Sequence, residues 1–220
     1  MKFNLLILSL AIIINFNNLF AQKTTDFQGT VTYTVTVDGE MDAMTKAQIP
    51  TEMTQTYKEN KIRTEQKSSM GSTIIISDSE TKITTILIDM MGNKMAITQT
   101  KEDADKAIQE MPEVKVTYLE ETKTIAGYNC KKATVEVSGE EKSVLDVYYT
   151  NEIEVSNPNS LSFFKDIKGV LLEYSQSAGD LTMKFSAKEI KKSKVKDSLY
   201  EIPDGYQQLT QEQFRSMLGQ

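Results

Sequence analysis

Strict alternation of apolar and polar residues over positions 27–38 constrains the fold of this chain more than any other feature. The odd positions are apolar or glycine and the even positions are mostly threonine: Phe27, Gly29, Val31, Tyr33, Val35 and Val37 alternate with Gln28, Thr30, Thr32, Thr34, Thr36 and Asp38. A period of two is that of a β-strand with one face on a core or cavity and the other in water. The same period recurs over residues 133–138 and 181–188. We therefore expect a sheet with one solvated face.

Further strand-like runs fill most of the remaining chain. They cover residues 54–58, 61–66, 72–77, 82–89, 94–99, 114–120, 144–150 and 170–176. Turn residues separate these runs and helical periodicity between them is sparse, which indicates an antiparallel meander rather than alternating βαβ units. We expect a mainly β fold of roughly eight to eleven strands. A sheet of that size must curl or close.

Helix signals are few. The clearest is at the C-terminus, where Thr210 and Gln213 form a capping box before an apolar stripe. Weaker signals cover residues 41–48 and 103–110, and each of these is followed by a proline that stops a helix. Residues 161–167 are a further short candidate. The sequence thus predicts a β domain with a few short helices, including one at the C-terminus.

Residues 1–21 have the pattern of a secretory signal peptide. Lys2 precedes an apolar stretch at residues 5–14, and the segment ends at Ala21. The apolar run is too short to cross a bilayer. We therefore expect cleavage after Ala21, a single mature domain over residues 22–220, and a periplasmic rather than extracellular location. An uncleaved anchor is the alternative.

The composition excludes several function classes. The chain has no histidine, no tryptophan and one cysteine, which rules out histidine-based triads, histidine-ligated zinc and an intramolecular disulfide. Its formal net charge of −6 disfavours binding to nucleic acid. No phosphate-binding glycine loop or serine nucleophile motif is present. We expect no enzyme activity, no metal and no cofactor.

Five segments carry a resemblance to a known family. They are residues 57–63, 121–133, 147–153, 168–174 and 200–206, of which the second reads Glu-Thr-Lys-Thr-Ile-Ala-Gly-Tyr-Asn-Cys-Lys-Lys-Ala. In these segments the chain resembles the exported Bacteroidota proteins of domain of unknown function 4412 (DUF4412). A sister family named for a Gly-Leu-Pro-Gly-Leu-Ile stretch (GLPGLI) is similar, but the corresponding residues 167–172 lack the proline. The resemblance implies a fold like that of the lipoprotein carriers LolA and LolB, an incomplete antiparallel barrel with helices over its concave apolar face. It implies no catalytic residues.

Methionines are concentrated in two regions, Met41 to Met70 and Met90 to Met111. Their flexible, polarizable side chains suit a cavity for a lipid or acyl chain. Gap-filling in an ordinary core is the alternative. With the alternating strand as one wall, the candidate ligand-binding residues are Tyr33, Val35, Arg63, Met41, Met44, Met90 and Met95.

Arg63 is one of two arginines, the other being Arg215. Inside a hydrophobic half-barrel it could bind backbone carbonyls of a lid or clamp an anionic head group, because its planar donors reach several acceptors. On a strand surface it would instead pair with Glu65 or Glu59.

Cys130 follows a predicted hairpin turn at Ala126 and Gly127, where glycine permits a positive φ. It is either a redox or intermolecular thiol or a small buried residue that packs on the sheet.

The leading functional hypothesis is a non-enzymatic periplasmic binding protein. Its ligand would be a lipid, a lipoprotein acyl chain or another hydrophobic molecule, bound in the concave face of the half-barrel. The alternative is a cell-envelope sensor or protein-interaction module with a filled core and an envelope protein as its partner. A hydrolase is a third and weaker hypothesis. We expect a monomer with no nucleic-acid partner and no transmembrane span.

Overall fold

The computed structural model describes residues 27–138, 143–178 and 181–217. The predicted signal peptide lies outside these ranges. The described residues form one sheet of twelve strands. The strands are β1 (Gly29–Asp38), β2 (Glu52–Lys58), β3 (Lys61–Ser68), β4 (Gly71–Asp78), β5 (Thr84–Met90), β6 (Asn93–Gln99), β7 (Val114–Ile125), β8 (Tyr128–Val137), β9 (Ser143–Thr150), β10 (Val170–Ala178), β11 (Leu181–Lys192) and β12 (Gln207–Thr210).

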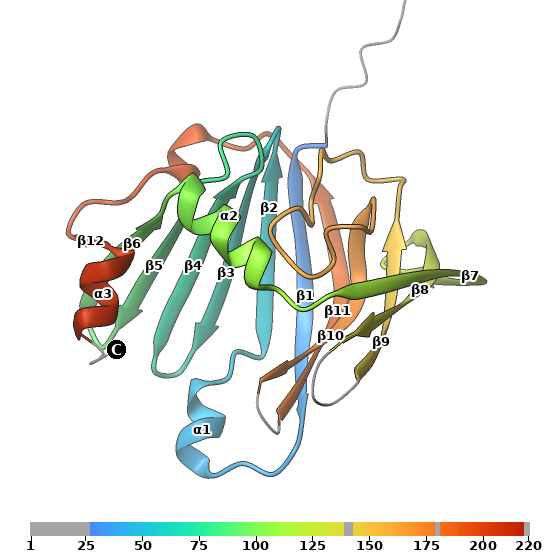
Figure 1. The fold of residues 1–220 in the computed structure, drawn as a ribbon, viewed down its shortest axis with the longest axis horizontal. Coiled ribbons are helices and arrows are strands. Elements are labelled where there is room, and N and C mark those ends of the chain that lie inside the picture. Colours follow the sequence, from blue (N-terminus) through green and yellow to red (C-terminus); the bar gives the residue numbers. More distant parts are fainter. Residues whose placement is uncertain (1–26, 139–142, 179–180, 218–220) are drawn as a thin grey trace, which may run out of the picture.

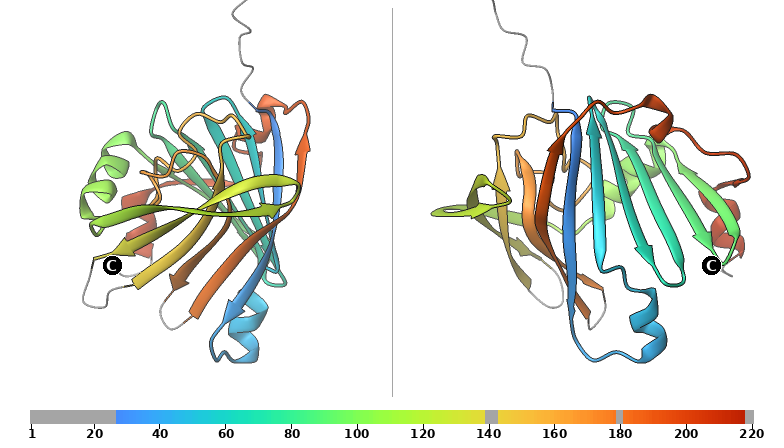
Figure 2. Two further views of the ribbon diagram at one scale, coloured as in Figure 1. Left: turned by 90° about the vertical axis from the view of Figure 1, so that its right-hand side faces the viewer. Right: turned by 180° about the vertical axis from the view of Figure 1, so that it is seen from behind.

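The sheet is curved and does not close (Figures 1 and 2). Its strand order is β12-β6-β5-β4-β3-β2-β1-β11-β10-β9-β8-β7, so β1 joins a wing of β2 to β6 with β12 to a wing of β11 to β7. All neighbours are antiparallel except β12, which pairs in parallel with β6. The predicted mainly β fold with a curved antiparallel sheet, an incomplete barrel, is confirmed. The sheet has one strand more than the upper end of the expected range. This additional strand is β12, which has only four residues.

The alternation of apolar and polar residues in β1 matches an alternation of buried and more exposed positions. Val31, Tyr33 and Val35 are buried, whereas Thr34 and Thr36 are exposed. The buried residues point to the face that α2 and the segment between β9 and β10 cover, which we call the concave face (Figure 1). The opposite, convex face carries the threonines.

Three short α-helices accompany the sheet: α1 (Ala43–Gln48), α2 (Lys101–Glu110) and α3 (Gln211–Met217), with a 3₁₀ turn at Asp197–Tyr200. Thr100 caps α2 in a reciprocal box with Asp103. The predicted capping box of α3 is confirmed, since the Gln213 amide N–H donates to Thr210 Oγ1 at 3.1 Å and the Thr210 N–H donates to Gln213 Oε1 at 2.9 Å. Every helix in the described ranges falls short of the length and apolarity needed to span a membrane.

The prediction of a helix over residues 161–167 is wrong, because this stretch is a series of turns. The Ser162 hydroxyl donates to the Asn159 backbone oxygen at 2.9 Å and accepts from the Phe164 N–H at 3.2 Å. Such local side-chain bonds offer the backbone an alternative to the helical ladder. The segment therefore folds as a compact connection between β9 and β10.

Two hydrophobic clusters stabilise the sheet, one on each face. On the concave face, the connection between β9 and β10 inserts Ile153, Phe164 and Ile167 over β1, β10 and β11. On the convex face, the chain after β11 covers β4 to β6. Its residues Tyr200, Ile202 and Tyr206 pack against Ile74, Ile76, Leu87 and Ala96. The concave face is thus filled by the chain itself only in the wing of β9 to β11.

The predicted turn between β7 and β8 is confirmed. Ala126 has a φ of 48° and Gly127 a φ of 87°, which is the left-handed pair that a tight hairpin requires. This turn places Cys130 near the start of β8.

Candidate ligand-binding site

A cavity of about 250 Å³ lies on the concave face, between the sheet and the connection from β9 to β10. We call it the concave cavity. Its sheet wall is formed by Met53, Gln55, Asn60, Ile62, Thr64, Gln66, Ile75, Ser77, Ser79, Tyr174, Gln176 and Phe185, and its other wall by residues 157–162. All of these side chains are uncharged. The cavity therefore combines apolar surface with amide and hydroxyl groups, without an ionic group.

An apolar row leads away from the cavity across the neighbouring strands. Strand register sets Thr64 opposite Ile75, Ile75 opposite Ile86, and Ile86 opposite Ile97. We call Ile75, Ile86 and Ile97 the isoleucine row. Ile97 is buried, but Ile75 and Ile86 are only half-buried, and α2 crosses the same side of the sheet (Figure 1). The concave face thus offers a polar recess continuous with a partly uncovered apolar strip.

Gln55 is held at the cavity wall by two buried tyrosines. The Tyr57 hydroxyl donates to Gln55 Oε1 at 2.5 Å. The Tyr33 hydroxyl reaches the same oxygen at 3.0 Å and the Leu171 backbone oxygen at 2.8 Å. Burial raises the pKa of both tyrosines well above the ordinary value, so both hydroxyls keep their protons as donors. The amide of Gln55 is therefore fixed with its carbonyl oxygen turned to the tyrosines.

Asn159 is held on the facing wall. Its side-chain amide donates to the backbone oxygens of Ile167 at 2.7 Å and Gly169 at 2.9 Å. These two bonds join the middle of the connection between β9 and β10 to its end. The amide nitrogen is thereby used, and the side-chain oxygen of Asn159 is left for the cavity.

Aromatic rings form the floor of the cavity. Tyr174 and Phe185 are stacked with centroids 4.8 Å apart and an interplanar angle of 13°. Phe164 meets Tyr174 edge-on at 5.6 Å. Packed rings of this kind make a rigid apolar surface. The floor of the cavity is therefore apolar and built from rings that pack on one another.

The structure does not bring the predicted ligand-binding residues together. Tyr33 and Val35 are buried on the concave face, where Tyr33 supports the cavity through Gln55. Met95 lies on the same face opposite Ile88. The other three predicted methionines lie away from the concave cavity. Met41 precedes α1, Met44 is a 70% exposed residue of α1, and Met90 is exposed at the end of β5.

Arg63 points to the convex face, because its strand neighbours Ile62 and Thr64 line the cavity. There its guanidinium pairs with Glu65. Arg63 thus forms the surface ion pair with Glu65 that the sequence analysis gave as the alternative to a role inside the half-barrel.

Cys130 is fully buried in the core. Burial raises the pKa of its thiol to about 11, and Sγ lies 3.6 Å from the Tyr128 backbone oxygen. A neutral thiol at this depth is a poor nucleophile. The structure therefore places Cys130 as a packing residue.

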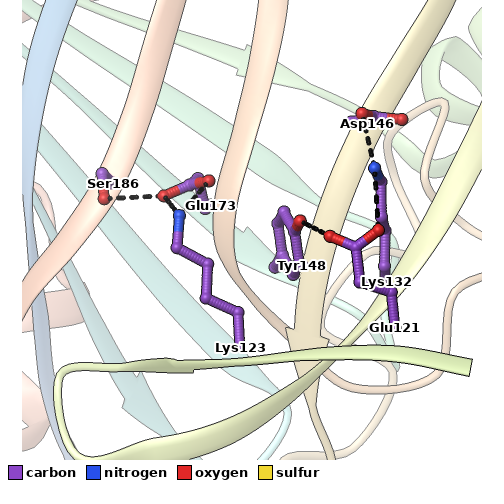
Figure 3. A network of polar contacts seen from close by, with 7 residues as sticks. All are labelled: Glu121, Lys123, Lys132, Asp146, Tyr148, Glu173 and Ser186. Carbon is purple, nitrogen blue, oxygen red and sulfur yellow. Dashed lines mark hydrogen bonds and ion pairs between the residues drawn. The ribbon is translucent and has the colours of Figure 1, made fainter.

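A polar network joins residues of β7 to β11, away from the cavity (Figure 3). It joins Glu121, Lys123, Lys132, Asp146, Tyr148, Glu173 and Ser186. Lys123 Nζ lies 2.8 Å from both carboxylate oxygens of Glu173, and Lys132 Nζ lies 2.9 Å from Asp146. Both lysines also flank the Tyr148 ring. Each charge in the network has a partner, so it is a surface network of paired charges. No group of three or more metal-binding side chains occurs among the residues that the structure describes.

Sequence reasoning missed Gln55, Asn159 and Gln176. For Gln55 a signal existed, since it occupies an inward position of β2 between Met53 and Tyr57. A polar residue at an inward position of a strand needs a partner or a function. For Asn159 there was no signal, because its role depends on how an irregular connection folds.

Comparison with known families shows the family of this chain. A model of the family described as N-glycanase peptide, N-terminal domain, matches residues 31–211. The chain belongs to this family. The comparison does not show the DUF4412 family that the sequence motifs suggested. The family domain covers the whole sheet from β1 to β12, including the concave cavity.

The solved structures that match this chain are distant from it. LprF from Mycobacterium bovis has 10% identity and a TM-score of 0.37, over 82% of this chain and 90% of that chain. The Mycobacterium tuberculosis lipoprotein LppX has 9% identity and a TM-score of 0.33, over 77% of this chain and 89% of that chain. No curated protein matches the sequence.

Proposed function

We propose that this chain is a non-enzymatic binding protein that holds a small hydrophobic or amphipathic ligand in the concave cavity and along the isoleucine row. We further propose that it acts in the periplasm after loss of residues 1–21. The side chains that line the cavity include no carboxylate, amine or thiol that could act as an acid, base or nucleophile. The site is therefore equipped for binding.

One observation carries this proposal. β4 and β5 are interior strands, yet their two faces are covered differently. On the convex face Ile74, Ile76 and Leu87 are only 8%, 8% and 1% exposed, whereas Ile75 and Ile86 on the concave face are only half-buried. Covering an apolar surface of this kind with a ligand gains about 25 cal/mol per Å² before association costs. The concave face of this wing therefore has the surface for a ligand that its own chain does not supply.

The alternative of an interaction module with a filled core applies to only one wing. Ile153, Phe164 and Ile167 cover the concave face over β1, β10 and β11. Nothing comparable covers β4 and β5 among the described residues, because α2 buries only Ala104. The binding hypothesis is thus favoured over the filled-core hypothesis.

The family description favours a second candidate ligand, a glycan. The family is named for an N-glycanase, and the cavity is lined by amides and hydroxyls, which are suited to hydrogen bonds with sugar hydroxyls. The stacked pair of Tyr174 and Phe185 would receive the apolar face of a sugar ring. This candidate uses the same cavity and the same non-catalytic role.

A lysine at position 75 tests the proposal. We expect Ile75→Lys to weaken binding of the neutral apolar probe Nile red by at least about tenfold, since an ammonium beside the apolar row must be desolvated by the probe. Thr34→Lys adds the same charge on the exposed convex face of β1 and should leave the affinity unchanged. The measurement is probe fluorescence titration, with thermal unfolding to confirm that both variants fold.

Two results would count against the proposal. One is a wild-type protein that does not bind the probe. The other is a folded Ile75→Lys variant that binds it as well as Thr34→Lys does. Ile86→Lys, on the neighbouring strand of the same row, provides a second variant if Ile75→Lys does not fold.

A further inference from the structure

We propose that the concave cavity selects an uncharged head group that both accepts and donates hydrogen bonds, a hydroxyl or an amide, and holds it between Gln55 and Asn159. This inference rests on the proposed function and specifies the ligand class of the same site. It excludes fatty acids and anionic phospholipids as the preferred ligands.

The donor is the side-chain amide nitrogen of Gln55. Its carbonyl oxygen is already occupied by Tyr57 at 2.5 Å and Tyr33 at 3.0 Å. Tyr57 is buried and its hydroxyl has no acceptor other than Gln55 among the described residues, so turning the amide over would leave the Tyr57 hydroxyl unpaired, which is costly. The amide nitrogen makes no hydrogen bond with any described residue, and Gln55 lines the cavity. A donor is thus fixed on the sheet wall.

The acceptor is the side-chain oxygen of Asn159. Both amide hydrogens are committed to Ile167 and Gly169, at 2.7 Å and 2.9 Å. The side-chain oxygen has no donor among the described residues, and Asn159 lines the same cavity from the opposite wall. Because Gln55 and Asn159 line the same cavity, one donor and one acceptor without a protein partner are available to a ligand there.

An anionic head group fits this arrangement poorly. The oxygens of a carboxylate or of a fully ionised phosphate accept but do not donate, so the Asn159 oxygen would remain unpaired and would repel it. The lining contains no lysine or arginine, and Arg63 is turned to the convex face and paired with Glu65. Burial of a charge without a partner is expensive. A hydroxyl or amide instead satisfies both walls without a charge.

The size of the cavity fits a head group with its tail outside. The cavity volume of about 250 Å³ lies below the roughly 300–1,000 Å³ of pockets that enclose a whole drug-sized ligand. This is room for a compact polar group on the stacked rings of Tyr174 and Phe185. The isoleucine row begins at Ile75, which lines the cavity, and would receive an attached apolar tail.

The test compares ligands that share one dodecyl chain. Monododecanoyl glycerol and dodecyl glucoside carry neutral hydroxyl heads, and dodecanoate and dodecyl phosphate carry anionic heads. Displacement of Nile red should show both neutral ligands binding at least about tenfold tighter than both anions, since an unpaired buried charge costs more than one hydrogen bond. Calorimetry with free glucose and N-acetylglucosamine tests whether a head group binds without an attached tail.

Variants of Gln55 and Gln176 test whether binding depends on the Gln55 amide or on the polar lining of the cavity in general. Gln55→Glu keeps an acceptor for Tyr33 and Tyr57 but replaces the donor with a charge, and Gln55→Leu removes the amide. Each should lower the affinity for the neutral ligands by about tenfold and bring it close to that for the anions. Gln176→Leu changes a glutamine of the same cavity that has no tyrosine partner and should have an effect below about threefold.

Each outcome has one meaning. Binding of a free sugar that depends on Gln55 supports the inference and identifies a saccharide as the source of the head group. Anionic ligands that bind as tightly as neutral ones overturn the inference and leave the proposed function standing. Failure of Nile red and all the dodecyl ligands to bind overturns the proposed function as well.

Discussion

Replacement of Phe164 with alanine is expected to lower the free energy of unfolding by about 3–5 kcal/mol. The Phe164 ring is 2% exposed and meets the Tyr174 ring edge-on at 5.6 Å. It belongs to a connection that contains no strand or helix. Loss of the ring removes the main apolar anchor of that connection, which forms one wall of the cavity. Urea unfolding followed by circular dichroism measures the change.

The neighbouring ring provides the control. Phe163 is 37% exposed, and we expect Phe163→Ala to cost less than about 1 kcal/mol. The Phe164→Ala variant should also bind Nile red more weakly at a temperature where it is still folded, because the wall that carries Asn159 loses its support. Equal destabilisation by the two substitutions would show that the connection is not anchored by Phe164.

Replacement of Gly29 with alanine is expected to destabilise the chain by about 3 kcal/mol or more. Gly29 has a φ of 155°, and a Cβ atom there would lie 2.1 Å from the backbone oxygen of Lys191. That oxygen belongs to β11, so the clash pushes apart the two strands that join the wings of the sheet. The close approach of β1 and β11 cannot be relieved by a side-chain rotation. Urea unfolding again gives the magnitude.

Gly205 is the matched control for this substitution. It also has a positive φ, 86°, but a Cβ atom there would have nothing within 4 Å. Gly205→Ala should therefore cost only the backbone term, about 1 kcal/mol. If Gly29→Ala is no worse than Gly205→Ala, the junction of β1 and β11 tolerates separation and the account of the sheet centre is wrong.

Most of the sheet could be predicted from the sequence, because the period of two is a local signal. Residues 27–38 alternate so strictly that both the strand and its buried face follow from the pattern. β12 could not be predicted, since its four residues have no such pattern and pair in parallel with a strand far back in the chain. The missing helix at residues 161–167 has a different cause, the local bonds of Ser162.

The candidate site could be predicted only in part. The interpretation of methionines as cavity residues relied on composition, and Met44 illustrates its weakness, because composition does not say which side of a helix faces the sheet. Strand parity was the better guide. Successive side chains of a strand point to opposite faces, so Arg63 faces outward because its two strand neighbours face inward. The same rule places Gln55 on the inward face. The role of Asn159 depends on its hydrogen bonds to the backbone of Ile167 and Gly169. These bonds form only when the connection between β9 and β10 folds, and no local pattern predicts them.

The central claim is that the concave face of β3 to β5, and not the convex face, receives the ligand. Methyl NMR of isoleucine-labelled protein titrated with monododecanoyl glycerol tests it directly, because Ile74, Ile75 and Ile76 alternate between the two faces. We predict that the methyl signals of Ile62, Ile75 and Ile86 shift on binding while those of Ile74 and Ile76 stay in place. Shifts at Ile74 and Ile76 without shifts at Ile75, or no shifts at saturating ligand, would contradict the account.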